Sequence, residues 1–280
     1  MDTHRWADIL RVGDGVRLAD VDPGGRPGYT GGKADGVVDL ERGLATLSGL
    51  QERLFAQSRT GTAADAVLLV LQAMDSAGKG GIVRHVVGGV DPQGVALAAF
   101  AAPTLEEREH DFLWRIEKRL PRPGFIGVFD RSHYEDVLIG KVRALADASE
   151  IERRYDAINA FEAEVAASGV RIVKVMLHIS ADEQKKRLRE RLDRPDKHWK
   201  YNPGDVDERL VWDQYMQAYQ TVFDRTSTEA APWFVIPADS KWYARLAVQE
   251  LLLAALEDID PQWPLAAFDV AAEKARLEAS

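Results

Sequence analysis

The sequence predicts an α/β fold in which a mostly parallel β-sheet is flanked by helices. Between residues 67 and 257, short apolar runs alternate with longer segments of helical character, the pattern of repeated strand–helix–strand units. The first run, 67–74, is almost wholly apolar, as expected for a strand buried on both faces. With 280 residues, 46% of them hydrophobic, the chain is large enough for one such domain.

The N-terminal part of the chain predicts a loop followed by a helix. Residues 22–36 contain six glycines and two prolines, which favours a loop or arm over a regular element. Leucines then recur at helical spacing and predict one amphipathic helix, whose apolar stripe either packs on the core or forms an interface. The stripe consists of Leu40, Leu44, Leu47, Leu50 and Leu54.

Four further apolar runs predict the remaining strands, at 94–100, 125–129, 170–179 and 233–236. Helices are predicted between them, at 79–88, 105–119, 150–167, 181–192, 206–225 and 241–257. Two of these open with capping boxes, Thr104 with Glu107 and Ser180 with Glu183, and Asp205 with Glu208 makes a similar start. Since no repeat or linker interrupts the series, we expect one main domain over 38–260, an arm at 1–37 and a tail at 261–280.

The composition excludes several kinds of site. Without cysteine, the chain forms no disulfide, iron–sulfur cluster, thiolate zinc site or cysteine nucleophile. The six histidines show no metal-ligand spacing, so a histidine metal site is not expected. The first residues lack the features of a signal peptide and no apolar run is long enough to cross a bilayer. We therefore expect a cytoplasmic protein with no membrane partner.

Charge is distributed unevenly along the chain. The net charge is −9, yet residues 185–200 contain eight basic and three acidic side chains. Such a segment in an acidic protein either is a solvated face or binds a polyanion. The overall acidity argues against a nucleic-acid partner.

Residues 73–81 resemble a phosphate-binding loop between a strand and a helix. In such a loop backbone N–H groups face the anion and the lysine reaches the outer phosphates. Ala73 stands where the first glycine of the usual pattern is expected, and Gly80 replaces the hydroxyl residue that would hold magnesium, a role for which Asp75 is the candidate. The alternative is a plain turn rich in small residues. The predicted phosphate-binding residues are Ser76, Ala77, Gly78, Lys79, Gly80 and Gly81.

A second part of the site is expected where the strand at 125–129 ends. A carboxylate delivered there, Asp130, is what a Walker-B-type magnesium site requires, and Asp75 would lie at the same edge of a parallel sheet. Two aspartates suit Mg²⁺, which is commonly held by one or two carboxylates, waters and phosphate oxygens. Arg131 either neutralises phosphate charge during transfer or forms a salt bridge with Asp130 or Glu135.

The basic segment predicts a lid at about 185–212. Arg187, Arg191 and Arg194 fall on one helix face, and guanidinium groups suit bidentate contacts with phosphate. A loop rich in proline follows, which could close over phosphates and exclude water. No general base stands out, which fits a phosphate oxygen as the acceptor, because such an oxygen is already a nucleophile.

Other residues leave alternatives open. His133 and Tyr134 either line the pocket or fill the core, and Asp136 either binds metal or substrate or caps a helix. His178, in a predicted strand, is expected to be a packed histidine. The stretch 94–104 is a plausible lining for a nucleotide base.

Taken in order, five segments resemble the polyphosphate kinase 2 family, which comprises polyphosphate:nucleotide phosphotransferases. They are LQAMDSAGKGG (71–81), RHVVGGVDPQGV (84–95), DFLWRIEKRLPRPGFIGVFDRSHYEDVL (111–138), RLDRPDKHWKYNPGDVDER (191–209) and STEAAPWFVIPADSKWYARL (227–246). The residues of the third segment are similar to those of family members that act on AMP, ADP or both, although many of those members have Asn in place of Asp130.

The resemblance implies a thymidylate-kinase-like P-loop kinase domain at 38–260 with a helical lid. It also implies Mg²⁺-dependent, reversible phosphoryl transfer from inorganic polyphosphate to AMP or ADP, giving ADP or ATP, by a homo-oligomer. The matching positions assign phosphate binding to Lys79 and magnesium binding to Asp75 and Asp130. Stabilisation of the transferring group falls to Arg131 and Arg191. Further phosphate contacts are expected from Arg187, Lys197 and Lys200.

Two rival functions stay open at this point. An ATP-dependent nucleoside or nucleotide kinase would use the same loop and ignore polyphosphate. A non-catalytic polyanion- or nucleotide-binding protein would bind equally well without the two aspartates.

Overall fold

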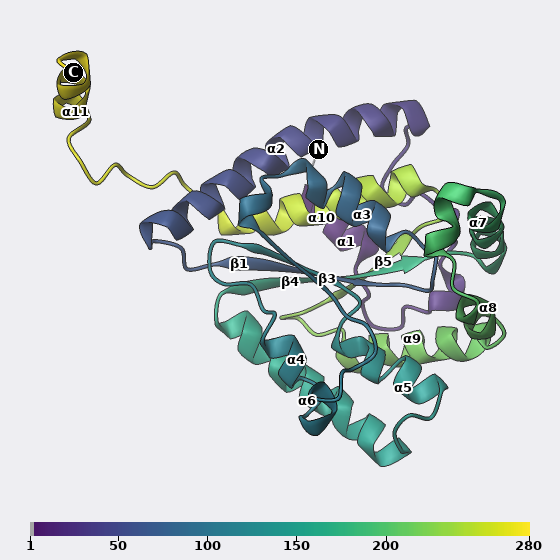
Figure 1. Cartoon of the computed structure of the whole chain (residues 1–280). Coiled ribbons are helices and arrows are strands. Elements are labelled where there is room, and N and C mark those ends of the chain that lie inside the picture. Colours follow the sequence, from purple (N-terminus) through teal and green to yellow (C-terminus); the bar gives the residue numbers. More distant parts are fainter. Residues whose placement is uncertain (1–2) are drawn as a thin grey trace.

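The computed structural model describes residues 3–280, in which a five-stranded sheet lies between two layers of helices (Figure 1). The strands are β1 (Ala66–Gln72), β2 (Val95–Ala99), β3 (Ile126–Asp130), β4 (Val170–His178) and β5 (Trp233–Pro237). Their order is β2-β3-β1-β4-β5 and every pairing is parallel. The predicted α/β class is confirmed, and each predicted apolar run overlaps one strand.

One layer consists of α2 (Lys33–Thr60), α10 (Lys241–Ile259), α3 (Lys79–His85) and α1 (Thr3–Leu10), above the sheet in Figure 1. The prediction of a loop over 22–36 is wrong for its last residues, since α2 begins at Lys33. Asp35 caps this start by accepting a hydrogen bond from the backbone of Gly32 (2.8 Å). The next glycine, Gly36, lies against Trp242, whose ring would be 2.3 Å from an added Cβ, so glycine allows α2 to approach α10.

The other layer consists of α6 (Ala148–Ala167) and α9 (Trp212–Thr226) with two short helices, α4 (Trp114–Glu117) and α5 (Ile139–Val142). The helix predicted at 105–119 is too long, since only α4 of it is α-helical. Its capping box forms, with Thr104 and Glu107 bonded reciprocally, but a 3₁₀ turn at Glu107–Glu109 follows the box. Asp111 then accepts a hydrogen bond from the backbone of Leu113 (3.1 Å), a local contact that competes with helix continuation.

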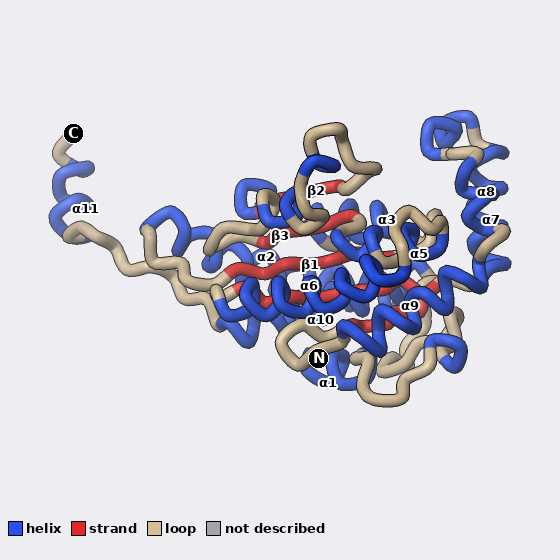
Figure 2. Tube along the Cα trace, turned by 90° about the horizontal axis from the view of Figure 1, so that it is seen from below, coloured by secondary structure: helices blue, strands red, loops and turns tan. Residues whose placement is uncertain are grey.

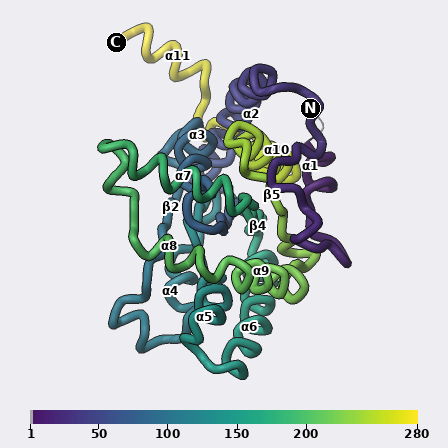
Figure 3. Tube along the Cα trace, turned by 90° about the vertical axis from the view of Figure 1, so that its right-hand side faces the viewer, coloured from purple at the N-terminus to yellow at the C-terminus, as the bar shows by residue number. Residues whose placement is uncertain are grey.

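The lid segment projects beyond the carboxyl ends of the strands. It contains α7 (Ala181–Asp193), a 3₁₀ stretch at Pro195–Lys200 and α8 (Gly204–Arg209). Figure 2 shows α7 and α8 standing apart from the body, and Figure 3 shows them between the two helical layers. The predicted helix at 206–225 is therefore two helices, α8 and α9. Asp205 does not cap the first, because its side chain pairs with Arg191 instead.

The C-terminal helix α11 (Val270–Glu278) lies away from the body at the end opposite to the lid (Figure 2). All its residues are exposed, as are Leu265 and Phe268 before it. Within residues 3–280, no helix combines the length and apolarity needed to cross a membrane.

A buried polar network underlies the turn that follows β3. Lys174 of β4 donates to Glu162 of α6 (2.5 Å) and to the hydroxyl of Tyr134 (2.8 Å). Tyr134 and His133 also contact Glu162, at 2.8 and 3.2 Å. His133 and Tyr134 are thus core residues, which decides between the two alternatives that the sequence left open. Because the opposite charges pair, their attraction offsets the unfavourable free energy of removing them from water.

Candidate active site

The loop between β1 and α3 has the shape expected of a phosphate cradle. Ser76 and Gly78 have positive φ angles of 66° and 128°, conformations that turn the backbone sharply between strand and helix. Lys79, only 9% exposed, folds back so that its Nζ donates to the carbonyl of Ala73 (3.0 Å). The lysine thus lies inside the loop and is held by a neutral acceptor that an incoming phosphate can replace.

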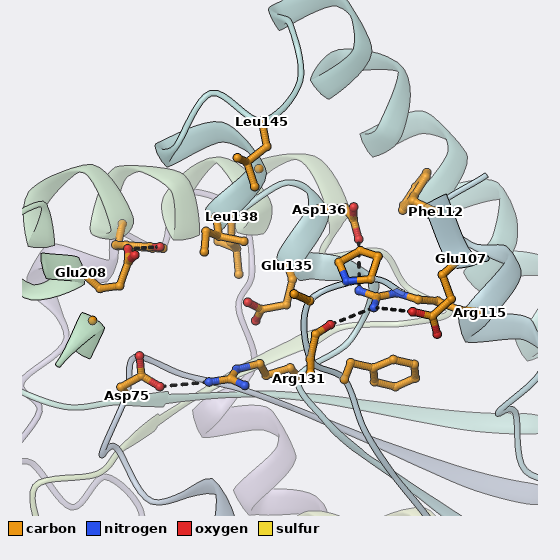
Figure 4. Close-up of a pocket in the computed structure, with 18 of the residues that line it drawn as sticks. Asp75, Glu107, Phe112, Arg115, Arg131, Glu135, Asp136, Leu138, Leu145 and Glu208 are labelled. Carbon is orange, nitrogen blue, oxygen red and sulfur yellow. Dashed lines mark hydrogen bonds and ion pairs between the residues drawn. The ribbon is translucent and has the colours of Figure 1, made fainter. Parts of the chain in front are cut away.

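The end of β3 lies beside this loop because β1 and β3 are neighbours. Leu71 is in register with Asp130, and the N–H of Arg131 donates to the carbonyl of Leu71 (3.0 Å). Arg131 Nη2 donates to Asp75 Oδ1 (3.1 Å), a contact drawn in Figure 4. The sequence left open whether Arg131 neutralises phosphate or forms an ion pair with Asp130 or Glu135, and the structure shows an ion pair with Asp75. The strand ends therefore bring both predicted parts of the site together.

Charges around Arg131 hold it in the protonated state. Burial alone would lower the pKa of its guanidinium, but Glu135, Asp75 and Asp130 outweigh burial and raise it. Burial raises the pKa of Glu135, which Arg131 and Lys79 partly oppose. Gln72 supports that carboxylate, since its amide, oriented with nitrogen towards Glu135, donates to Oε1 (2.9 Å). Glu135 was not among the predicted site residues, although it follows Asp130 by only five residues.

The lid contributes a second ion pair to the site. Arg191 Nη1 donates to Asp205 Oδ2 (3.2 Å) and to the carbonyl of Lys200 (2.9 Å), which ties α7 to the start of α8. Burial raises the pKa of Asp205, and Asp75 raises it further, so these two carboxylates are close enough to interact. The sequence reasoning missed Asp205 as a site residue because it predicted a helix cap there.

A cavity of about 790 Å³ opens beside the loop, at the carboxyl ends of β1, β2 and β3 (Figure 4). Its near end includes Asp75, Arg131, Glu135 and Asp205, and its walls are largely apolar. The wall formed by residues 100–103 lies within the stretch predicted to line a base pocket. The remaining apolar and aromatic lining includes Phe112, Leu138, Ile139, Leu145, Tyr215 and Tyr219. Concave, mostly apolar sites with a few polar groups are typical of small-molecule binding.

Comparison with known proteins agrees with this geometry. The family model for polyphosphate kinase 2 matches residues 38–264. The chain belongs to the polyphosphate kinase 2 family. It is 43% identical over 261 residues to the AMP/ADP-polyphosphate phosphotransferase of Meiothermus ruber, covering 93% of this chain and 95% of the relative. It is 44% identical over 237 residues to the ADP-polyphosphate phosphotransferase of Rhodopseudomonas palustris, covering 80% of each.

A solved structure shows the same fold. The crystal structure of Polyphosphate Kinase 2 from Arthrobacter aurescens TC1 matches with a TM-score of 0.96 and 61% identity, covering 98% of this chain and 97% of that chain. The parallel order of strands, the cradle and the lid are thus features shared with a polyphosphate kinase 2 enzyme.

Within this polyphosphate kinase 2 site, Arg187 does not face the cavity. Its guanidinium is 4% exposed and donates to backbone carbonyls, among them those of Ser76 and Ala77. The sequence predicted that Arg187 binds phosphate with Arg191, but the structure places the two differently along α7. Arg187 lies where the helix meets the body, and Arg191 lies one turn further out.

The two lid lysines lie near the tip of the lid and away from the cradle. Lys197 pairs with Asp196 (3.2 Å), and the Nζ of exposed Lys200 lies 4.8 Å from the centre of the Trp199 ring. Their phosphate contacts therefore stay a prediction.

The far end of the cavity is organised by ion pairs that no sequence motif indicated. Arg115 lies 3.5 Å from Glu107 and 3.8 Å from Asp136, and it donates to the carbonyl of Ala101 (2.9 Å). Arg154 of α6 also contacts Asp136 (3.5 Å). Asp136 therefore pairs with arginines, a role outside the alternatives that the sequence left open. These residues come from separate elements, so their local sequence carries no signal of the grouping.

Cations also gather on the opposite flank of the cradle. Burial lowers the pKa of His85, and Arg245 and Arg84 lower it further. Burial and Arg84 likewise lower the pKa of Arg245, and an added Cβ on Gly81 would lie 3.8 Å from the Arg245 guanidinium. Among residues 3–280, neither Arg84 nor Arg245 forms an ion pair within 4.0 Å with a carboxylate. This flank is consequently positive and open to an anion.

The acidic residues fit a metal ion that is shared with phosphate. In the described part of the chain, no group of three or more His, Asp or Glu side chains is arranged to hold a metal ion. Mg²⁺ needs no such group, because one or two carboxylates suffice when waters and phosphate oxygens complete its shell. Asp75, in the loop after β1, and Asp130, the last residue of β3, both raise the pKa of Arg131 and are the two carboxylates that could serve in this way.

Proposed function

We propose that this chain is a polyphosphate:nucleotide phosphotransferase that transfers a phosphoryl group from inorganic polyphosphate to AMP or ADP. The observation that carries the proposal is the joining of the cradle to the end of β3 by the Arg131–Asp75 contact, within the polyphosphate kinase 2 fold. Relatives that match most of this chain are named for AMP, ADP or both as substrates of this reaction.

The two flanks of the cradle suit the two substrates. The cavity of about 790 Å³, with its partly apolar walls, accommodates a nucleotide with its phosphates towards Arg131. The positive flank of Arg84 and Arg245 suits the long polyanion on the other side of Lys79. A terminal phosphoryl group of polyphosphate would then lie between donor and acceptor, above the loop.

The chemical step requires positioning and charge neutralisation more than proton transfer. A phosphate oxygen of AMP or ADP attacks the terminal phosphorus, a new P–O bond forms, and the bond to the shortened polyphosphate breaks. Lys79, Arg131 and Arg191 neutralise the negative charge of the transferring group. The backbone of Ser76–Gly81 holds the phosphates, and Lys197 and Lys200 join them when the lid closes.

We assign the metal of this reaction to Asp75 and Asp130, and we propose Mg²⁺. When bound there, such an ion would supply positive charge that neutralises the phosphates. To bind the metal, the Asp75 carboxylate must share or give up its ion pair with Arg131. The Arg131 guanidinium would then pair with the substrate phosphates. The step is therefore expected to depend on a divalent cation and to stop when EDTA removes it.

The family match over 38–264 supports a kinase domain at 38–260, with an arm at 1–37 and a tail at 261–280. The homo-oligomer that the resemblance implies is part of the same proposal. These assignments belong to the proposal.

The function is tested by incubating the purified protein with Mg²⁺ and polyphosphate, with AMP in one reaction and ADP in another, and separating nucleotides by chromatography. We expect ADP from AMP and ATP from ADP, and no product from Lys79→Ala. Asp75→Asn and Asp130→Ala should abolish turnover. Conversion of AMP only when ATP is the donor would contradict the proposal and indicate an ordinary nucleotide kinase. Turnover by both aspartate variants at the wild-type rate would overturn the metal assignment.

A further inference from the structure

The geometry around Arg187 points to a role that differs from phosphate binding. We propose that Arg187 is a positioning residue that holds the phosphate loop in its anion-binding shape from the side opposite to the anion. The inference rests on the proposed function, since it concerns how the same loop binds polyphosphate. It makes the root of the lid helix part of the phosphate site, although Arg187 itself touches no substrate.

Each N–H group of the Arg187 guanidinium donates a hydrogen bond within the protein. Nη1 donates to the carbonyls of Ser76 (3.1 Å) and Ala77 (2.7 Å). Nη2 donates to the carbonyls of Ala238 (2.6 Å) and Asp239 (3.0 Å), and Nε donates to Glu183 Oε1 (2.9 Å). A buried guanidinium with five such hydrogen bonds has no donor left for a phosphate.

The contact with Ala77 sets the direction of the next N–H group. In a trans peptide the C=O and N–H point to opposite sides, so fixing the Ala77 carbonyl towards Arg187 turns the Gly78 N–H away from it. In the described residues that N–H has no hydrogen-bond partner, which leaves it for an anion. Gly78 has a positive φ of 128°, a backbone conformation that residues with a side chain rarely adopt. The contact of Arg187 with the preceding carbonyl helps to hold the loop in this conformation.

The same residue fixes the loop relative to the lid and the end of β5. Arg187 spans from the loop to residues 238 and 239, and Gln184, one turn earlier, donates to the carbonyl of Asp75 (3.1 Å). The base of α7 is therefore anchored on the cradle, while Arg191 further out bonds only to the lid itself. Movement of the outer lid can then proceed without disturbing the loop.

The test compares Arg187→Lys with Arg171→Lys as the matched control. Arg187→Lys keeps the positive charge and loses the branched guanidinium group, here called the fork, whose N–H groups donate to the loop carbonyls. Arg171 is exposed and lies near the start of β4, at the opposite end of the sheet. Binding of inorganic tripolyphosphate and of AMP is measured separately by calorimetry, without turnover. Hydrogen–deuterium exchange of residues 74–81 is measured without ligand. Arg187→Ala with added guanidinium ion provides a second, chemically distinct readout.

We expect Arg187→Lys to weaken tripolyphosphate binding about tenfold, because charge-assisted hydrogen bonds to the loop are lost. AMP binding should change less than about twofold, exchange in 74–81 should rise, and guanidinium should partly restore tripolyphosphate binding to Arg187→Ala. Arg171→Lys should behave as the wild type in all respects.

Two results would overturn the inference. Tripolyphosphate binding that is unchanged in folded Arg187→Lys would show that the loop does not need the fork. Weaker binding with unchanged exchange in 74–81 would show that Arg187 contacts the phosphate directly. Failure of the proposed function is distinguishable, since a wild type that binds tripolyphosphate but transfers no phosphate to AMP or ADP would refute the activity and leave the binding comparison intact.

Discussion

At the scale of single residues, each main cation of the site is held by an acceptor of the chain itself. Lys79 bonds to the Ala73 carbonyl, Arg131 to Asp75, and Arg191 to Asp205. These contacts keep the positive groups ordered without substrate, and they are contacts that phosphate oxygens can replace. The site is thus preorganised for anions, with little conformational cost on binding.

Sequence motifs predicted which residues gather at the active site, but they gave little information on which of these residues pair with one another. Lys79, Asp75 and Arg131 were predicted from their place after two strands, and the parallel register brings them together. The partner of Arg131 was not predictable, because the pairing crosses between strands. The role of Arg187 was also missed, since helical spacing places it near Arg191 and carries no information on what covers its base.

The buried carboxyl of Glu250 predicts a pH-dependent stability. Burial raises its pKa from 4.5 to about 7, helped by Glu257 and Asp39, and its Oε2 has no hydrogen-bond partner in the described residues. The folded state binds this proton more tightly than the unfolded state. Through this group the free energy of unfolding falls as the pH rises from about 4.5 to about 7, by about 3 kcal/mol.

We therefore expect Glu250→Gln to be more stable than the wild type at pH 8 by up to about 3 kcal/mol, and little different at pH 4.5. Urea unfolding at both pH values measures this. Glu52→Gln, at an exposed position, is the control and should change neither value. An equal effect of Glu250→Gln at both pH values would contradict the assignment.

The Lys174–Glu162 pair predicts a strong effect of breaking one side only. Lys174→Met leaves Glu162 buried without its cation, which should lower the free energy of unfolding by about 3–5 kcal/mol. Adding Glu162→Gln to the same variant should recover part of the loss, because the uncompensated charge is gone. Urea titrations of both variants test this, and a double variant less stable than the single one would rule out the charge explanation.

At the scale of elements, apolar runs predicted the strands well and polar side chains limited the prediction of helices. All five strands lie within two residues of the predicted runs. The helix at 105–119 was predicted too long, since Asp111 bonds locally to the backbone, and the helix at 206–225 is divided at residues 210–211 between α8 and α9. Periodicity shows which positions are apolar, whereas it does not show where a helix is interrupted.

The lid predicts a fluorescence change on substrate binding. Trp199 at its tip is 78% exposed, so closure over phosphates should transfer its ring to a less polar environment. We expect the tryptophan emission to shift to shorter wavelength when tripolyphosphate and AMP are added together. In Trp199→Phe that shift should be largely lost while activity remains. An equal shift in both proteins would place the change outside the lid.

At the scale of the whole molecule, the strand order β2-β3-β1-β4-β5 explains why one edge of the sheet is the functional one. The chain leaves β1 towards β2 and β3 on one side and then crosses to β4 and β5 on the other, so a crevice opens at the end of β1. The phosphate loop and the turn after β3 lie at this crevice. The class of fold could be predicted from the sequence, but the packing of α1 in one of the helical layers could not.

The tail predicts tolerance to truncation. Residues 265–280 are exposed throughout and α11 is capped by its own Asp269, so the body loses no packing when they are removed. Deletion of 265–280 should shift the thermal midpoint by less than about 2 °C and leave specific activity unchanged. A larger fall, measured by calorimetry at the same protein concentration, would mean that these residues are packed against another copy.

The central claim is that polyphosphate donates the phosphoryl group at the Lys79 cradle. The most direct measurement follows radiolabelled polyphosphate incubated with unlabelled ADP and Mg²⁺, with Lys79→Ala as the blank. We predict that label appears in the γ-phosphate of ATP with the wild type alone. An unlabelled nucleotide pool, together with ADP production when ATP and AMP are supplied, would contradict the account and assign the cradle to a nucleotide donor.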